Sequence, residues 1–286
     1  MATYPFDQID VFCPEPPGGN PLAVVHDADG LTEDPMVEFA RWTNLSETTF
    51  LLPPTAEGRA QGADYRVRIF TPGGELPFAG HPTIGSCHAW LARGARPGGG
   101  SATVLQECGI GLVALRIEAD RIAFAAPPLL RSGPVAADDV QRVAVALGLG
   151  PRDVVDAAWA DNGPGWMGLL LTDAATVLAL RPDFAALGDA KVGVVGPHPT
   201  GGPADVEVRA FCPGYGVPED PVTGSLNAAL AMWLIGTGRL PTTYVAAQGT
   251  ALGRRGRVHV SRDEAGVVWV GGAARTVITG SVELGA

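Results

Sequence analysis

Two short segments of the sequence resemble each other and carry residues that can move protons or bind polar groups. The first reads HPTIGSCHAWLA from His81, the second reads DPVTGSLNAALA from Asp220, and six of the twelve positions are identical at an offset of 139 residues. An imidazole and a carboxylate can each donate or accept a proton. Just upstream, RIFTP from Arg68 parallels RAFCP from Arg209. The repeat predicts two equivalent modules with His81 and Asp220 at related positions.

Each repeated segment is typical of a helix that begins with proline, a residue whose missing N–H has no partner at the first helical position. The preceding residue, His81 or Asp220, is then predicted to be the N-cap. Aspartate is also a strong capping residue, so a purely structural Asp220 stays open. Small residues follow at 83–86 and 223–225. They leave the N-terminal amides approachable, and two such helix ends meeting in one cleft could hold a carboxylate.

A third candidate is Glu47, in the stretch NLSETTFLL, where a polar cluster passes into an apolar strand. An exposed carboxylate in a turn has the same local pattern. Glu75, Glu219 and other acids compete equally with it. Local chemistry alone therefore does not single out Glu47.

The elements that must position these residues are many short strands and a few helices. Strands are predicted at 9–12, 22–26, 65–70, 113–117, 122–125, 206–211, 258–261 and 267–270, separated by segments rich in glycine and proline. Helices are predicted at 32–42, 82–93, 137–147 and 221–235. Many strands with few helices favour an α+β fold over a βαβ alternation. The proline-rich stretch 127–134 is a candidate linker between the two halves.

Composition narrows the class of protein. The chain has 286 residues and a formal net charge of −10, which argues against nucleic acid or an anionic membrane as the main partner. Four cysteines without a CxxC pair predict neither a disulfide framework nor a zinc site, and a metal site at Cys87 and His88 is not expected. The sequence contains no P-loop or dinucleotide fingerprint. With no signal peptide or membrane span predicted, we expect a cytoplasmic protein.

Several blocks in a fixed order resemble the phenazine-biosynthesis PhzF-like isomerase family. They are GNPLAV from Gly19, NLSET from Asn44, RIFTP from Arg68, FAGHPT from Phe78, EDPVTGS from Glu219, and QG followed by GR at 253–254. The resemblance implies the diaminopimelate epimerase-like fold, in which two similar domains each wrap a curved antiparallel sheet around a central helix. We expect an N-terminal half at 1–117, a C-terminal half at 118–274 and a last strand at 275–286 that returns to the first half.

The resemblance also implies roles for individual residues. Glu47 corresponds to the glutamate that shuttles a proton in the family's isomerase, and His81 and Asp220 complete the expected catalytic set. The residues expected to bind a small carboxylic acid substrate are Gly80, Pro82, Thr83, Thr223, Gly224 and Ser225. No cofactor or metal is expected, and the chain is expected to form a homodimer. Epimerase relatives use two facing cysteines, but Cys87 and Cys212 fall outside the matching positions.

Three functions remain open from the sequence. The first is an isomerase that moves a double bond by a proton shift. The second is a racemase or epimerase that pairs a glutamate with a histidine or an aspartate. The third is a protein that binds a small molecule without turnover. Deuterium uptake from solvent separates them, because a shifted double bond, an inverted centre and tight binding without exchange are different outcomes.

Overall fold

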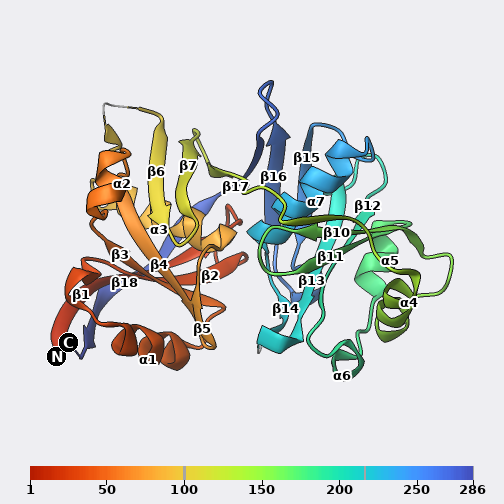
Figure 1. The fold of residues 1–286 in the computed structure, drawn as a ribbon, viewed down its shortest axis with the longest axis horizontal. Helices are drawn as coiled ribbons and strands as arrows, with labels where there is room; N and C mark the ends of the chain where they lie inside the picture. The colour runs from red at the N-terminus through yellow and green to blue at the C-terminus, as the bar shows by residue number, and fades with distance from the viewer. Residues whose placement is uncertain (99–100, 216, 286) are drawn as a thin grey trace. The chain divides into compact units, whose positions relative to one another are not determined.

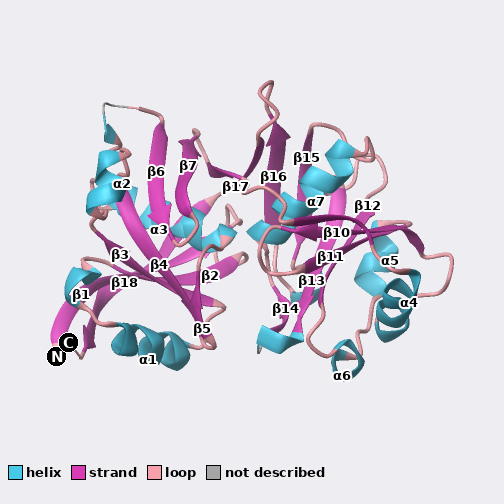
Figure 2. Ribbon diagram, viewed as in Figure 1, coloured by secondary structure: helices cyan, strands magenta, loops and turns pink. Residues whose placement is uncertain are grey.

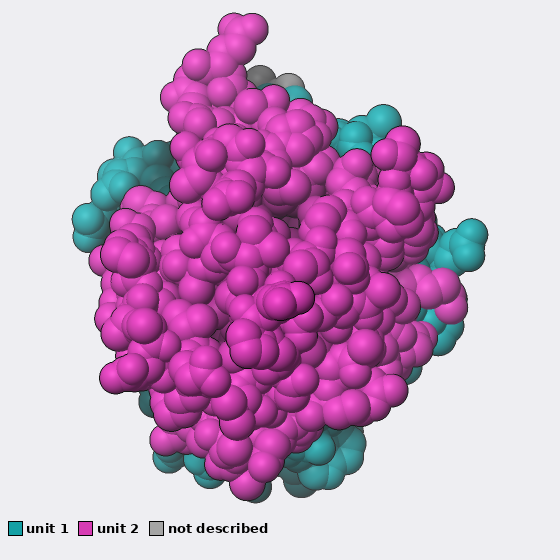
Figure 3. All heavy atoms as spheres, turned by 90° about the vertical axis from the view of Figure 1, so that its right-hand side faces the viewer, with its two compact units in different colours: residues 1–125, 271–286 teal, residues 126–270 magenta. Residues whose placement is uncertain are grey.

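The computed structural model describes residues 1–98, 101–215 and 217–285. The chain divides into unit 1, residues 1–125 with 271–286, and unit 2, residues 126–270 (Figure 3). The first division lies after Ala125 rather than at the expected residue 117. The reason is that β8 (Ile122–Ala125) pairs with β7 (Gly111–Ile117) and so belongs to the sheet of unit 1. The second division lies four residues before the expected 274.

The described residues of unit 1 form strands and three helices (Figure 1, Figure 2). Its remaining elements are β1 (Ala2–Val11), β2 (Asn20–Val25), a 3-10 turn (Ala28–Gly30), α1 (Glu33–Thr43), β3 (Glu47–Leu52), α2 (Ala56–Ala60), β4 (Tyr65–Thr71), β5 (Gly74–Leu76), α3 (Gly80–Ala92), β6 (Thr103–Cys108) and β18 (Ala274–Leu284). The last strand, β18, pairs antiparallel with β1, with an irregularity between Gln8 and Ile9.

In the part of unit 2 that the structure describes, there are strands and four helices, two of them very short (Figure 1). Its elements are β9 (Arg131–Pro134), α4 (Ala137–Ala146), β10 (Val154–Asp161), β11 (Trp166–Leu171), α5 (Ala174–Ala179), α6 (Phe184–Leu187), β12 (Lys191–Pro197), β13 (Val206–Cys212), a 3-10 turn (Pro213–Tyr215), β14 (Val217–Asp220), α7 (Gly224–Gly236), β15 (Thr243–Gln248), a 3-10 turn (Thr250–Leu252) and β16 (Gly256–Arg262). Strand β17 (Val268–Gly272) contains the division at Val270. None of the helices in the described segments has the length and apolar character needed to span a membrane.

The two units share one pattern of strand pairing. In unit 1, β1–β2 is antiparallel, β2–β3 parallel, β3–β4 and β4–β5 antiparallel, β4–β6 parallel and β6–β7 antiparallel. In unit 2 the same succession joins β10, β11, β12, β13, β14, β15 and β16. Helix α3 lies between β5 and β6 in the chain, and α7 lies between β14 and β15. The repeat in the sequence therefore corresponds to a repeat in topology.

Helices α3 and α7 are the central helices of their units. Helix α3 packs against β1, β2, β3, β6, β8 and β18, and α7 packs against β10, β11 and β16. Nearly every residue of α7 is buried, as expected of a helix that is apolar on all sides. A Cβ at Gly85 would lie 2.5 Å from Cδ2 of Leu22, so glycine permits the close approach of α3 to β2. Gly193 on β12 gives the same room to Leu226 of α7.

Helix α1 covers one outer face of the unit 1 sheet, where it contacts β3 and β4 (Figure 2). Its apolar side enters a buried cluster with Phe39, Phe50 and Phe70, and the rings of Phe50 and Phe70 meet edge to face at 5.5 Å. The cluster anchors β3 between α1 and β4. Glu47, the first residue of β3, is therefore attached to a packed part of the unit.

Candidate active site

Glu47 and His81 lie side by side in unit 1. Oε2 of Glu47 is 3.5 Å from Nε2 of His81, and the two side chains are 14% and 3% exposed. On the other side of the imidazole, Nδ1 lies 3.3 Å from the amide nitrogen of Asn20. The imidazole is thus held between an amide and a carboxylate, in a largely dry setting.

Local structure explains how these residues meet. Helix α1 ends at Asn44, which adopts the left-handed conformation (φ 53°) that asparagine tolerates well. The chain then turns directly into β3, where Glu47 pairs with Leu22 of the parallel strand β2. Asn20 begins that strand, so both neighbours of His81 are positioned by the β2–β3 pair.

Burial lowers the pKa of His81 to about 3. The imidazole is therefore neutral at physiological pH and keeps one N–H donor and one acceptor nitrogen. Its place in the first turn of α3 acts in the same direction, because the positive end of a helix dipole disfavours a cation. His81 can orient Glu47 or a bound group by hydrogen bonding without adding positive charge.

The predicted N-caps were wrong in both halves. Helix α3 begins at Gly80 with Ala79 as its N-cap, so His81 is the second helical residue. Proline is tolerated throughout the first turn, which lets the helix start before Pro82. Helix α7 begins at Gly224 with Thr223 as its N-cap. Asp220 does not reach the helix because it is still part of β14, where it pairs with Ala210.

Asp220 is held by a hydrogen-bond network around Gln248 in unit 2. The hydroxyl of Thr223 donates to Oδ2 of Asp220 at 2.5 Å. Nε2 of Gln248 donates to the Thr223 hydroxyl and to the carbonyl of Asp220. Oε1 of Gln248 accepts from the Thr223 amide and from Asn227. The buried Gln248 side chain therefore joins β15, the end of β14 and the start of α7.

Ser225 lies in the first turn of α7 and has its own two partners. Nε1 of Trp166 donates to the Ser225 hydroxyl at 3.3 Å, and the side-chain amide of Asn162 donates to the Ser225 carbonyl at 2.9 Å. Because Trp166 uses a lone pair of the hydroxyl oxygen, the hydroxyl proton remains able to donate to another group.

Unit 1 has a counterpart of the Gln248 network. Nε2 of Gln106, in β6, donates to the hydroxyl of Thr83, which in turn donates to the carbonyl of Ala79. Tyr65 donates to Oε1 of the same glutamine at 2.8 Å. Sequence reasoning missed Gln106 and included Gln248 only as part of the QG block of the family resemblance. Their common place, on the strand that follows the central helix, was the signal that could have pointed to both.

The structure thus brings the expected residues together in two groups. Unit 1 contains Glu47 beside His81, with Gly80, Pro82 and Thr83 in the first turn of α3. Unit 2 contains Asp220 bonded to Thr223, with Gly224 and Ser225 in the first turn of α7. Among the described residues, no group of three or more His, Cys, Asp or Glu side chains could hold a metal ion.

Cys87 and Cys212 are both buried. Burial raises the pKa of the Cys87 thiol, inside α3, to about 12. A thiol with this pKa stays protonated at neutral pH and is a poor base. Cys212 is buried at the end of β13, where its sulfur contacts the carbonyl of Val217 at 3.4 Å.

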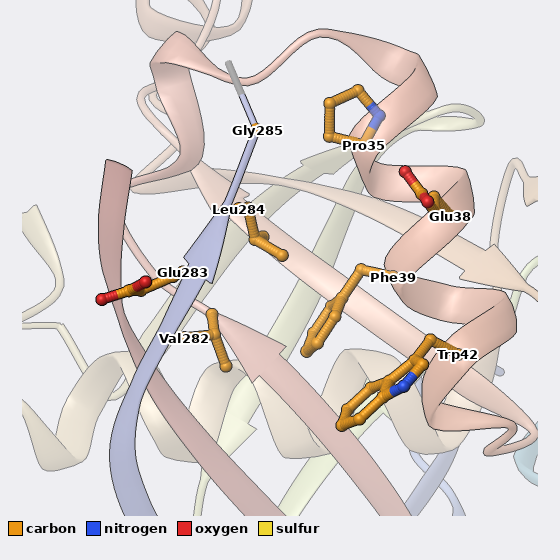
Figure 4. A pocket seen from close by; sticks show the side chains of 8 residues that line it. All are labelled: Pro35, Glu38, Phe39, Trp42, Val282, Glu283, Leu284 and Gly285. Atoms are coloured by element: carbon orange, nitrogen blue, oxygen red, sulfur yellow. The ribbon is translucent and has the colours of Figure 1, made fainter. Parts of the chain in front are cut away.

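A separate hollow of about 400 Å³ lies in unit 1 between α1 and the end of β18 (Figure 4). Phe39, Trp42, Val282 and Leu284 point toward it, and Glu38 and Glu283 lie at its edge. Of the described residues that line it, none belongs to the expected site. The hollow is largely apolar and lacks the acid–base pair found at Glu47 and His81.

Known proteins resemble the chain over nearly its whole length. The family model described as phenazine biosynthesis-like protein matches residues 9–280. Antisense-enhancing sequence 1 of Schizosaccharomyces pombe is 38% identical, over 98% of this chain and 99% of that protein. Trans-2,3-dihydro-3-hydroxyanthranilate isomerase of Pseudomonas aeruginosa is 35% identical, over 90% of each chain.

A solved structure agrees with these matches. The crystal structure of a phenazine biosynthesis protein of the PhzF family from Enterococcus faecalis has a TM-score of 0.79 at 27% identity, over 99% of this chain and 100% of that chain. The expected α+β, diaminopimelate epimerase-like fold is confirmed. The sheet of each unit is mainly antiparallel, with two parallel pairs. The chain belongs to the phenazine biosynthesis-like (PhzF-like) family and is an isomerase.

Proposed function

We propose that this isomerase shifts a proton, and with it a carbon–carbon double bond, within a small cyclic amino or hydroxy carboxylic acid. Glu47 carries the proton, and the reaction uses no cofactor. The observation that carries the proposal is the contact of 3.5 Å between Glu47 and the buried, neutral His81. The relative from Pseudomonas aeruginosa is named for trans-2,3-dihydro-3-hydroxyanthranilate, and we take this compound as the test substrate.

One carboxylate is sufficient for the reaction. The Glu47 carboxylate takes a proton from a ring carbon, and the electron pair of the broken C–H bond forms the new double bond. The electron pair of the old double bond then forms a C–H bond at the other end of the allylic unit, using the proton held by Glu47. Glu47 ends as a carboxylate, so base and acid are the same group and no net proton is consumed.

His81 supports this step as a hydrogen-bonding group. With a pKa of about 3 it remains neutral, so it does not form a permanent ion pair with Glu47 that would weaken the carboxylate as a base. Asn20 fixes one side of the ring and Glu47 faces the other. This arrangement keeps the proton carrier in one orientation through both half-reactions.

The residues of unit 2 are proposed to bind the substrate. The carboxylate of Asp220, which accepts a hydrogen bond from Thr223, is suited to amino and hydroxyl groups. The Ser225 hydroxyl, with Trp166 as its donor, can give its proton to a substrate carboxylate oxygen. Ser225 also lies in the first turn of α7, where backbone amides favour an anion.

Glu47→Gln tests the proposal, because it keeps the size of the side chain and removes the proton carrier. The variant should lose turnover of trans-2,3-dihydro-3-hydroxyanthranilate by about 10²–10⁴-fold or more, the range typical of general acid–base groups. The measurement is deuterium incorporation from D₂O, followed by mass spectrometry and NMR of the product. Binding of 3-hydroxyanthranilate, an aromatic analogue that cannot undergo the shift, should survive in calorimetry.

Glu75→Gln is the matched control. Glu75 lies in unit 1 too, but it is exposed and pairs with Arg68, so its amide variant should exchange at the wild-type rate. Deuterium exchange at the wild-type rate in Glu47→Gln would remove Glu47 from the mechanism. An inverted centre without a moved double bond would favour a racemase or epimerase, and tight binding with no exchange would favour a non-catalytic protein.

A further inference from the structure

Asn162 has a buried oxygen without a partner beside the start of α7. It lies between β10 and β11, its residue is 8% exposed, and its Oδ1 has no hydrogen-bond partner among residues 1–98, 101–215 and 217–285. A buried acceptor without a partner costs about 1–3 kcal/mol. Such an atom in a packed region points to a missing donor.

The orientation of the Asn162 amide is fixed by its surroundings. Its nitrogen donates to the carbonyl of Ser225 at 2.9 Å. Only the amide nitrogen can bond to a carbonyl oxygen, so the side chain cannot exchange its two ends. The backbone is fixed as well, because the carboxylate of Asp161 accepts from the amides of Gly163 and Gly165. Oδ1 is therefore a buried acceptor without a partner on a side chain whose orientation is fixed.

Ser225 and Asn162 provide a donor and an acceptor on two residues that are joined by a hydrogen bond. The Ser225 hydroxyl accepts a hydrogen bond from Trp166 and can donate its proton, whereas Oδ1 of Asn162 can only accept. The joining hydrogen bond runs from the Asn162 amide nitrogen to the carbonyl of Ser225. A carboxylate with a neighbouring N–H or O–H group on a ring satisfies both at once.

Unit 1 shows a related arrangement. Asn20 begins β2, the strand that corresponds to β11, and its amide contacts His81 in the first turn of α3. In each unit, an asparagine at or before the start of the second strand of this pattern therefore contacts the start of the central helix. In unit 1 the contact is with the imidazole, whereas in unit 2 it is with a main-chain carbonyl, which leaves the amide oxygen of Asn162 available.

We propose that Oδ1 of Asn162 accepts a hydrogen bond from a ring amino or hydroxyl group of the substrate, and so selects cyclic acids that carry such a donor. The inference rests on the proposed function for the substrate class and on the proposed role of Ser225. It adds Asn162 as a second acceptor for the amino and hydroxyl groups of the substrate, in addition to the carboxylate of Asp220. Loss of the donor in the ligand leaves Oδ1 buried without a partner, which is the situation in which polar sites discriminate strongly.

The test compares four ligands in calorimetry against the wild type and Asn162→Leu. The ligands are 3-hydroxyanthranilate with both donors, anthranilate with the amino group, 3-hydroxybenzoate with the hydroxyl group, and benzoate with neither. In the wild type, removal of the recognised donor should weaken binding by about 10-fold or more. In Asn162→Leu the same removal should change affinity by less than about twofold, because the acceptor is gone. Comparison of anthranilate with 3-hydroxybenzoate shows whether Asn162 binds the amino group or the hydroxyl group.

Two further variants separate recognition from structural support. Trp166→Phe removes the donor to the Ser225 hydroxyl but leaves Asn162 in place, so it should affect all four ligands alike and keep the preference for the donor. Asn162→Asp keeps an acceptor oxygen, so its affinities should fall together while the preference persists. This variant provides the test if Asn162→Leu does not fold.

The outcomes are distinct. The role of Asn162 would be overturned if Asn162→Leu weakened the binding of all four ligands equally. It would also be overturned if Asn162→Asp lost the preference for ligands with the recognised donor. Both results would leave the proposed function standing. Failure of the wild type to bind any of the four acids would overturn the proposed substrate class, and the role of Asn162 with it.

Discussion

At the scale of single residues, the main feature of the site is that Glu47 lies beside a histidine with an unusually low pKa. Burial lowers the pKa of His81 to about 3, although a hydrogen bond to the backbone of Pro21 acts in the opposite direction. Desolvation therefore outweighs this hydrogen bond. A neutral imidazole suits a reaction in which a single carboxylate must act first as a base and then as an acid.

This pKa predicts a measurable effect on stability. Between pH 6.5 and about 3, the unfolded chain binds a proton at His81 and the folded chain does not. The contribution of His81 to stability is therefore complete above pH 6.5 and is lost as the pH falls, by at most about 1.4 kcal/mol per pH unit. Urea unfolding of the wild type and His81→Gln at pH 7, 6 and 5 measures it. As the pH falls from 7 to 5, the free energy of unfolding of the wild type should decrease relative to that of the variant. The same pH dependence in both proteins would contradict a neutral buried His81.

At the scale of secondary-structure elements, Gln248 connects the strand β15 to the start of α7. Its side chain uses both ends, as acceptor from the Thr223 amide and Asn227, and as donor to Thr223 and the Asp220 carbonyl. Buried networks with every member bonded fix one arrangement of the backbone. The position of Asp220 depends on this connection, because Asp220 is the last residue of β14, just before the link to α7.

Gln248→Leu should therefore destabilise the protein. Leucine fills much of the space but leaves the main-chain amide of Thr223 without its acceptor and removes one of the two acceptors of the Asn227 side chain, at a cost of about 2–4 kcal/mol. The free energy of unfolding from urea titration measures the loss. Gln61→Leu is the control, because Gln61 is exposed on the surface and should change stability by less than about 0.5 kcal/mol. Similar effects of the two substitutions would show that the Gln248 network contributes little.

At the scale of the whole molecule, the chain contains two units with one topology but different polar groups at their central helices. Unit 1 provides Glu47 and the neutral His81, and unit 2 provides Asp220, Ser225 and the open acceptor of Asn162. The shared scaffold supports the same kind of helix start in both units, while the side chains at that start have diverged.

The family resemblance predicts a homodimer of such chains. Most soluble oligomers of identical chains are symmetric, and twofold dimers are the commonest. Sedimentation equilibrium or light scattering should give twice the mass of one chain, which is 29.4 kDa. A mass that stays at the value of one chain across micromolar concentrations would contradict the prediction.

The sequence by itself determined the repeat, the existence of the main helices and strands, and the family. These follow from local patterns: identical residues at 81–92 and 220–231, caps and apolar runs, and blocks in a fixed order. The helices at 32–42 and 137–147 agree with α1 and α4 to within about a residue at each end. Glu47 was singled out by family resemblance alone, because its local sequence matches that of any turn carboxylate.

The tertiary structure decided where the central helices begin and which polar atoms are satisfied. Helix α7 starts at Gly224 because Asp220 is retained in β14 by its pairing with Ala210, a contact that no local pattern contains. Asn162 bonds to Ser225 across 63 positions of sequence. Burial likewise sets the neutral state of His81. Each of these depends on desolvation or on hydrogen bonds between distant segments, and both arise only when the chain is packed.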